Sequence, residues 1–235
     1  MATPATIVII SAGIGEPSST RLLADRLASK TLDQLAARKI DATVATIELR
    51  SLGAEIAQAA VTGVPAAKLQ LAIDQVASAD AVIAATPVYK AGISGLFKLF
   101  IDILDDDLLI AKPVVLTATA GSARHALVPD EQMRPLFAFM RSLVIPTSLF
   151  AAPDDWADPS LGSRIDRAGA ELAALVSSGV TDSIVRGAWH GYQHQFGGNA
   201  RPQGADDALD GIDFDSDLMR LAASGSLRPA DPAGS

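Results

Sequence analysis

The chain has 235 residues, a formal net charge of −8 and no cysteine. Without cysteine it forms no disulfide and no thiolate metal site, and an acidic chain without a dense Lys/Arg block is a poor candidate for a nucleic-acid surface. Hydrophobic residues make up 49% of the chain, which is ample for a core. Because the chain lacks a basic surface, we expect a small-molecule partner. The absence of cysteine is compatible with the reducing cytoplasm.

The first third of the chain alternates strand and helix patterns. Residues 1–6 lack the basic stretch and the apolar run of a secretion signal. Residues 6–10 predict a buried strand, residues 19–39 a helix, and residues 42–49 a second strand. Residues 50–64 are expected to be irregular, and Pro65 then precedes a helix over residues 68–78.

The alternation continues through the rest of the expected domain. Residues 81–86 predict the third strand, and this apolar run is too short to cross a bilayer, which needs about 20 residues as a helix. We therefore expect no membrane partner. The remaining predicted elements are a helix over 94–104, a strand over 114–119, a helix over 130–142, a strand over 144–151 and a helix over 163–178.

Repeated strand–helix units predict an α/β fold. Strands that are apolar on both faces imply a parallel sheet covered by helices on both sides. Five such units fit a flavodoxin-like three-layer sandwich with a five-stranded parallel sheet in the order 2-1-3-4-5. We expect this domain to occupy residues 1–180. Residues 181–235 are expected to form a C-terminal extension rich in Gly, Asp and Pro, with one helical pattern at Phe214, Leu218 and Leu221. We expect this pattern to dock on a neighbouring subunit, on the mouth of the ligand site or on a partner protein, and the alternative is independent disorder.

The loop after the first predicted strand is rich in hydroxyl side chains. In a flavodoxin-like sheet, ligands bind beyond the carboxyl ends of the strands. Hydroxyl groups and free N–H groups at a helix N-terminus can hold a phosphate, although a serine there can also act as an N-cap alone. The candidate phosphate ligands are Ser11, Ser18, Ser19 and Thr20.

Two other functions of this loop fit less well. Gly13 and Gly15 match the first two glycines of a dinucleotide fingerprint, but the third position is Ser18 and the acidic Glu48 comes too late. A response-regulator site needs an acidic residue where Ser11 stands.

Two later segments carry a family resemblance. The loop and helix over 87–102, PVYKAGISGLFKLFID, resemble the second signature of the NAD(P)H-dependent FMN reductase family, in particular the branch that supplies reduced flavin to two-component monooxygenases. The loop over 117–127, TATAGSARHAL, is similar to a third segment of that family. The resemblance covers about residues 6–152.

The resemblance implies hydride transfer from NADPH or NADH to FMN. It places one edge of the flavin ring at the loop after the third strand and the other edge at the loop after the fourth. Glycines in these loops would let the backbone approach a flat ring closely. The implied cofactor-binding residues are Pro87, Val88, Tyr89 and Lys90 on one side and Ala120, Gly121 and Ser122 on the other, with Ser11, Ser18, Ser19 and Thr20 at the phosphate.

The cofactors provide the reactive atoms, so we expect no catalytic acid, base or nucleophile from the protein. Family members commonly carry an arginine in the first loop, and here Gly13 takes its place with Glu16 nearby. This difference predicts a weaker hold on the phosphate. FMN would then leave as a substrate, for a flavin-dependent monooxygenase partner.

Several alternatives stay open. Tyr89 and Lys90 could be solvated surface residues, and His125 could bond to the backbone only. His190 and His194 have the spacing of a metal pair, but Gly191 disfavours a helix there, so we expect no metal site. A quinone or azo reductase, a flavodoxin-type electron carrier and a flavin-free interaction module are the competing functions.

The predicted helix over 94–104 is apolar around most of its surface. A helix of this kind is buried on several sides, which predicts a subunit contact in a homodimer or homotetramer. The alternative is that the C-terminal segment of the same chain covers it.

Overall fold

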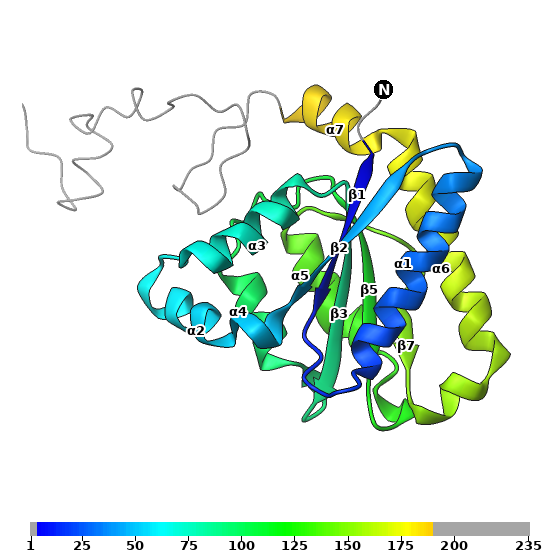
Figure 1. The fold of residues 1–235 in the computed structure, drawn as a ribbon, viewed down its shortest axis with the longest axis horizontal. Coiled ribbons are helices and arrows are strands. Elements are labelled where there is room, and N and C mark those ends of the chain that lie inside the picture. The colour runs from blue at the N-terminus through cyan, green and yellow to red at the C-terminus, as the bar shows by residue number, and fades with distance from the viewer. Residues whose placement is uncertain (1–3, 190–235) are drawn as a thin grey trace, which may run out of the picture. The chain divides into compact units, whose positions relative to one another are not determined.

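A parallel β-sheet lies at the centre of the described part of the chain (Figure 1). The computed structural model describes residues 4–189. The strands run in the order β2-β1-β3-β5-β6, with β7 also paired to β5 and a short β4 paired antiparallel to β3. They are β1 (Ala5–Ser11), β2 (Ala42–Glu48), β3 (Ala81–Tyr89), β4 (Gly92–Ile93), β5 (Pro113–Thr119), β6 (Leu143–Val144) and β7 (Leu149–Ala151).

Helices cover both faces of this sheet (Figure 1). The helices α1 and α6 pack together over one face, and α2 to α5 lie over the other. The helices are α1 (Ser19–Ala37), α2 (Gly53–Thr62), α3 (Ala67–Ser78), α4 (Gly95–Asp102), α5 (Arg134–Phe139), α6 (Pro159–Ser178) and α7 (Val180–Ala188), with the short turns η1 (Leu49–Leu52), η2 (Ala123–His125), η3 (Pro129–Met133) and η4 (Pro153–Ala157).

Strand β1 shows why the sheet needs two helical layers. Ile7 and Ile9 pack into the cluster beneath α1 and α6, whereas Val8 and Ile10 pack into the cluster beneath α2 to α5. All four side chains are fully buried. Burial of each side chain contributes about 1.5–3 kcal/mol to the stability of the fold, so the strand is stable only when helices cover both of its faces. The predicted three-layer flavodoxin-like sandwich is confirmed, with β5 as the fourth predicted strand.

The fifth predicted strand is divided in two. β6 pairs with the start of β5 and β7 with its end, so the single strand expected over 144–151 is wrong in detail. Pro146 lies between the two pieces, and the last N–H of the first piece to bond β5 is that of Ile145, which donates to the Val114 carbonyl at 3.0 Å. The next residue, Thr147, turns away to Glu171, whose carboxylate accepts from its N–H at 2.9 Å and its hydroxyl at 2.8 Å.

The segment over 50–64 is helical, and the expectation of an irregular loop was wrong. Within it η1 leads directly into α2, whose Ile56 and Ala59 are buried in the core. Gly63 ends α2 in the left-handed conformation with φ 73°, and its N–H donates to the Ala59 carbonyl. Glycines are common in loops, but here Gly53 is the first residue of the helix and Gly63 is its C-cap.

Helix α4 is covered in part by the same chain. Phe97 and Phe100 are fully buried, and Leu96 and Leu99 pack against the same cluster. Helix α2, which sequence analysis did not predict, packs beside α4. This contact accounts for part of the apolar surface on which the prediction of a subunit contact was based.

Other predicted features differ or lie outside the described residues. The helix expected over 130–142 is the π-helical turn η3 followed by α5. Helix α7 begins at residue 180, where the domain was expected to end, and so belongs to the expected extension. Among residues 4–189, no single helix is long and apolar enough to cross a membrane, and residues 49–62 and 67–78 pass that test only as a pair bent by 90°. Phe214, Leu218 and Leu221, together with His190 and His194, lie outside the described residues.

Candidate functional site

Parallel pairing brings the three predicted ligand loops to one edge of the sheet. Ser11 at the end of β1 is paired with Ala85 of β3, and Pro87 further along β3 is paired with Thr119 at the end of β5. The chain leaves β1 with the Ala12 N–H donating to the Ala85 carbonyl at 2.9 Å. The loops after β1, β3 and β5 therefore begin side by side, as the sequence predicted.

The first loop ends in a capped helix. Ser18 is the N-cap of α1, and its Oγ accepts from the Arg21 N–H at 3.2 Å. Ser19 is exposed and begins the helix. A helix start leaves its first N–H groups without partners in the helix, and these carry the positive end of the helix dipole. Ser18 thus has the capping role that the sequence left open, beside backbone groups suited to an anion.

Gly13 is enclosed by this cap. Gly13 is buried, and a Cβ at this position would lie 2.0 Å from Ser18 Oγ and 3.2 Å from Thr20 Cβ. Ser11 Oγ accepts weakly from the Gly13 N–H at 3.4 Å. The absence of a side chain at residue 13 allows the loop to close over the start of α1.

Thr20 has a partner that the sequence did not indicate. Its Oγ1 lies 2.7 Å from Oγ1 of Thr119, and both residues are buried. This hydroxyl pair joins the first turn of α1 to the end of β5. Thr119 is therefore a further residue of the site, recognisable in sequence only as a threonine ending an apolar strand.

Charged side chains flank the first loop in a chain of ion pairs. Arg50 binds Glu16 at 2.6 Å and Glu48 at 2.9 Å, and Arg21 binds Glu48 at 2.6 Å and Asp25 at 2.7 Å. The hydrogen bond from Arg50 lowers the pKa of the Glu16 carboxyl. The role of Arg50 was not visible in the sequence, because η1, which carries it, was expected to be irregular. The two cations beside the loop are thus already matched by three carboxylates.

The second loop is a tight hairpin. β3 pairs with β4 through Val88 with Ile93 and Tyr89 with Gly92, so Lys90 and Ala91 form a two-residue turn. Pro87 is buried, Val88 is half-buried, and Tyr89 and Lys90 are exposed, Tyr89 to 45%. The predicted flavin-facing residues therefore change along the strand from core to surface.

The third loop leaves β5 beside the first two. Ala120 and Ser122 are half-buried and Gly121 is exposed, and a Cβ added at Gly121 would meet no atom within 4 Å. The Arg124 Nε donates to Ser122 Oγ at 2.9 Å. His125 lies in η2, half-buried. The structure thus brings the predicted residues of all three loops to one edge.

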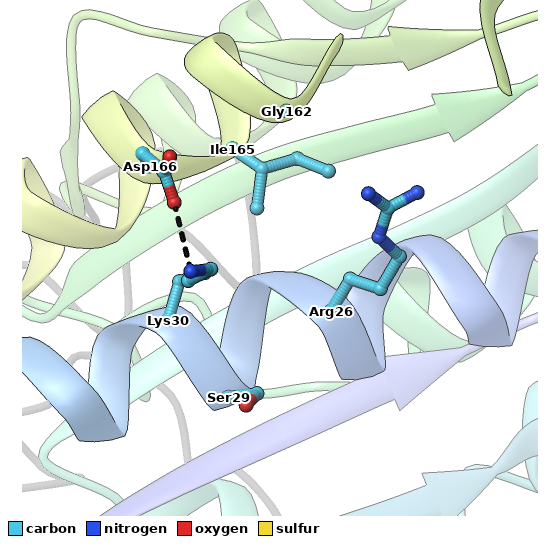
Figure 2. A pocket seen from close by; sticks show the side chains of 6 residues that line it. All are labelled: Arg26, Ser29, Lys30, Gly162, Ile165 and Asp166. Atoms are coloured by element: carbon cyan, nitrogen blue, oxygen red, sulfur yellow. Dashed lines mark ion pairs between the residues drawn. The ribbon is translucent and has the colours of Figure 1, made fainter. Parts of the chain in front are cut away.

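A separate cavity lies between α1 and α6. Figure 2 shows its lining, and its volume is about 330 Å³. Lys30 and Asp166 form an ion pair of 3.4 Å there. None of the residues predicted for ligand binding lines this cavity. Its lining residues are Arg26, Ser29, Lys30, Gly162, Ile165 and Asp166.

Metal-binding side chains do not cluster in the part of the chain that the structure describes. Within residues 4–189 no group of three or more His, Cys, Asp or Glu side chains could hold an ion. The pair His190 and His194 falls outside that range.

Comparisons with known proteins agree on one family. Residues 5–157 match the model of a family described as NADPH-dependent FMN reductase. A Pseudomonas aeruginosa protein named FMN reductase (NADPH) is 36% identical over 174 residues, which are 74% of this chain and 91% of that protein. The NADH-dependent FMN reductase SfnE of Pseudomonas putida is 35% identical over 178 residues, with 74% of this chain and 91% of that protein covered.

Solved structures show the same similarity. An oxidoreductase from Corynebacterium diphtheriae is 42% identical with a TM-score of 0.73, covering 75% of this chain and 99% of that one. The apo form of the NADH:FMN oxidoreductase EmoB is 29% identical with a TM-score of 0.62, covering 72% of this chain and 89% of that one.

Proposed function

The chain belongs to the NADPH-dependent FMN reductase family, and we propose on that premise that the three loops at the carboxyl edge of its sheet bind FMN and NAD(P)H for hydride transfer. The observation that carries the assignment of the site is the geometry of the first loop. A buried glycine without room for a Cβ and a capped helix start meet there, at the same edge of the sheet as the end of β3.

The first loop fits the phosphate of FMN. Gly13 lets the chain close over the start of α1, where free N–H groups and the dipole favour an anion. The hydroxyls of Ser11, Ser18 and Ser19 lie on the same loop, and we assign them to the phosphate end. Thr20 is bonded to Thr119, so we assign it to shaping the loop as well as to the phosphate.

The second and third loops fit the flavin ring. Tyr89 ends β3 and Lys90 begins the turn after it, both exposed, and Gly121 leaves open space beside the end of β5. When both cofactors are bound, the nicotinamide ring supplies a hydride that the flavin ring accepts. The chain must hold the two rings in contact and stabilise the added negative charge with N–H and hydroxyl donors.

We also propose that FMN leaves after reduction, to a flavin-dependent monooxygenase. The cations beside the first loop, Arg21 and Arg50, are both paired with carboxylates, and Arg50 is paired with Glu16 of the loop itself. A phosphate bound here therefore gains less charge assistance than it would from an unpaired arginine. Weak retention suits a flavin that is a substrate. We place the reaction in the cytoplasm, a compartment that suits a chain without cysteine.

A homodimer or homotetramer remains the proposed assembly. Leu127, just before η3, and Phe139, the last residue of α5, are 62% and 65% exposed. Large exposed apolar side chains are typical of surfaces that another chain covers. The mass in solution, measured by light scattering, tests this proposal, and a monomer would contradict it.

A reductase assay tests the function directly. Purified protein is mixed with FMN and either NADH or NADPH, and oxidation is followed at the nicotinamide absorbance band. We expect flavin-dependent oxidation of at least one nicotinamide and none when flavin is omitted. Tight flavin binding without oxidation would favour an electron carrier, and no flavin binding would favour an interaction module. Oxidation that needs a quinone or azo compound instead of free FMN would favour those reductases.

A further inference from the structure

The hairpin that joins β3 to β4 contains a strained turn. Lys90 and Ala91 both have positive φ, 50° and 66°. A two-residue hairpin turn of this kind favours Asn-Gly, because an ordinary L-residue in the left-handed region has its Cβ close to a carbonyl oxygen. Neither residue of this turn is Asn or Gly, so the hairpin needs support from outside.

Gln132 supplies this support. Its Oε1 accepts from the Ile93 N–H at 3.0 Å, and its Nε2 donates to the Ala91 carbonyl at 3.1 Å. Both polar atoms of one planar amide are thus bonded to the backbone on either side of Gly92. A Cβ at Gly92 would lie 3.1 Å from Oε1, so a glycine there allows the amide to approach.

The residue that supports the hairpin stands on an anchored segment. Gln132 lies in η3, where the Arg134 N–H reaches back to the Pro129 carbonyl in a π-helical turn. The next residue, Met133, is fully buried in the core. Arg134 binds Asp130 at 2.7 Å and donates to the Ile145 carbonyl at 3.2 Å. The backbone at Gln132 is therefore held in place by the burial of Met133 and by the bond from Arg134 to the segment after β6.

We propose that Gln132 is a positioning residue for flavin: it holds the backbone of the 89–92 hairpin in the position from which the hairpin contacts the flavin ring. It acts through the backbone of residues 91 and 93 and so couples the segment after β5 to the loop after β3. The inference rests on the proposed function, because it takes this hairpin to line the flavin.

The test replaces Gln132→Met, which keeps the length of the side chain and removes both hydrogen bonds. Gln132 is exposed, so its bonds compete with water, and we expect Kd to rise by about three- to tenfold for both FMN and riboflavin. We expect kcat at saturating FMN to fall as well, because the flavin ring is held less accurately against the nicotinamide ring. The matched control is the exposed neighbour Glu131→Gln, which should change neither value.

A rescue variant separates positioning from general stability. Ala91→Gly removes the cost of the left-handed conformation, so in the Gln132→Met background it should restore most of the flavin affinity. If wild type reduces FMN and Gln132→Met has unchanged Kd and kcat, the inference is wrong. A lowered melting temperature with unchanged Kd and kcat, or no recovery by Ala91→Gly, also overturns it. If wild type neither binds flavin nor oxidises NAD(P)H, the proposed function itself fails and the inference falls with it.

Discussion

Gly13→Ala should disrupt the first loop through its helix cap. The new Cβ would lie 2.0 Å from Ser18 Oγ, which is far inside contact distance, so the serine must rotate and release the Arg21 N–H. Loss of an N-cap costs about 1 kcal/mol and overpacking a further 1–3 kcal/mol. We therefore expect the free energy of unfolding to fall by roughly 2–4 kcal/mol, measured by urea denaturation.

A double mutant tests whether the cap carries this cost. Ser18→Ala alone removes the cap and should cost about 1 kcal/mol. In Gly13→Ala/Ser18→Ala the clashing Oγ is gone, and the remaining contacts, to the Cβ atoms of residue 18 and Thr20, are both 3.2 Å, which is tight but far less severe than 2.0 Å. The double mutant should therefore lose clearly less stability than the sum of the two single mutants.

Flavin titration by fluorescence checks the functional half of the prediction. Gly13→Ala should weaken FMN at least tenfold and riboflavin much less, since only FMN carries the phosphate. Gly15→Ala is the comparison within the same loop: its Cβ would lie 3.3 Å from the Pro17 carbonyl, a tight contact that does not touch the cap, so only a larger effect of Gly13→Ala is due to the cap. Equal losses for the two flavins would show that this loop does not bind the phosphate. Additive stability losses would refute the proposed clash with the cap.

Three further predictions concern other parts of the molecule. Gly169→Ala should destabilise the fold by roughly 1–3 kcal/mol in urea denaturation, because its Cβ would lie 3.2 Å from the Lys30 backbone, whereas Gly162→Ala meets nothing within 4 Å and should be neutral or stabilising. Burial lowers the pKa of Lys112 to about 8, so between pH 8 and its unfolded value near 10.5 the folded state has lost a proton that the unfolded state keeps. The stability of wild type relative to Lys112→Met should therefore rise with pH across that window, by roughly 1–3 kcal/mol, and a fall would contradict the assignment. Finally, wild type should lose most of its flavin on desalting and show a rate that saturates with added FMN; one FMN per subunit retained through dialysis, with no effect of added FMN, would identify a prosthetic group.

Much of the fold was predictable because its information is local. Strands that are apolar on both faces, such as residues 7–10, require cover on two sides, and the alternation with helices then restricts the order of the sheet. The serine-rich end of the first loop likewise indicated a capped helix start, and Ser18 is the N-cap. The positions of the candidate loops followed from the direction of the strands.

The errors have a physical cause as well. Residues 50–64 were expected to be irregular, but the burial of Ile56 and Ala59 against the core stabilises α2, although glycines of low helix propensity stand at both of its ends. The division of the fifth strand reflects Thr147, whose N–H is the next donor in line for β5 but bonds to Glu171, 24 residues further along the chain.

By itself the sequence determined the layers, the strand order, the edge of the sheet that carries the loops and the family. Only the tertiary structure decided which polar groups meet there. Thr20 and Thr119 are 99 residues apart, Glu16 and Arg50 are 34 apart, and Ile93 and Gln132 are 39 apart. Hydrophobic period and capping act within a few residues and can be recognised in a single segment. A hydrogen bond between distant segments depends on how the crossovers bring strand ends together to within a few ångströms, and no local pattern encodes that distance.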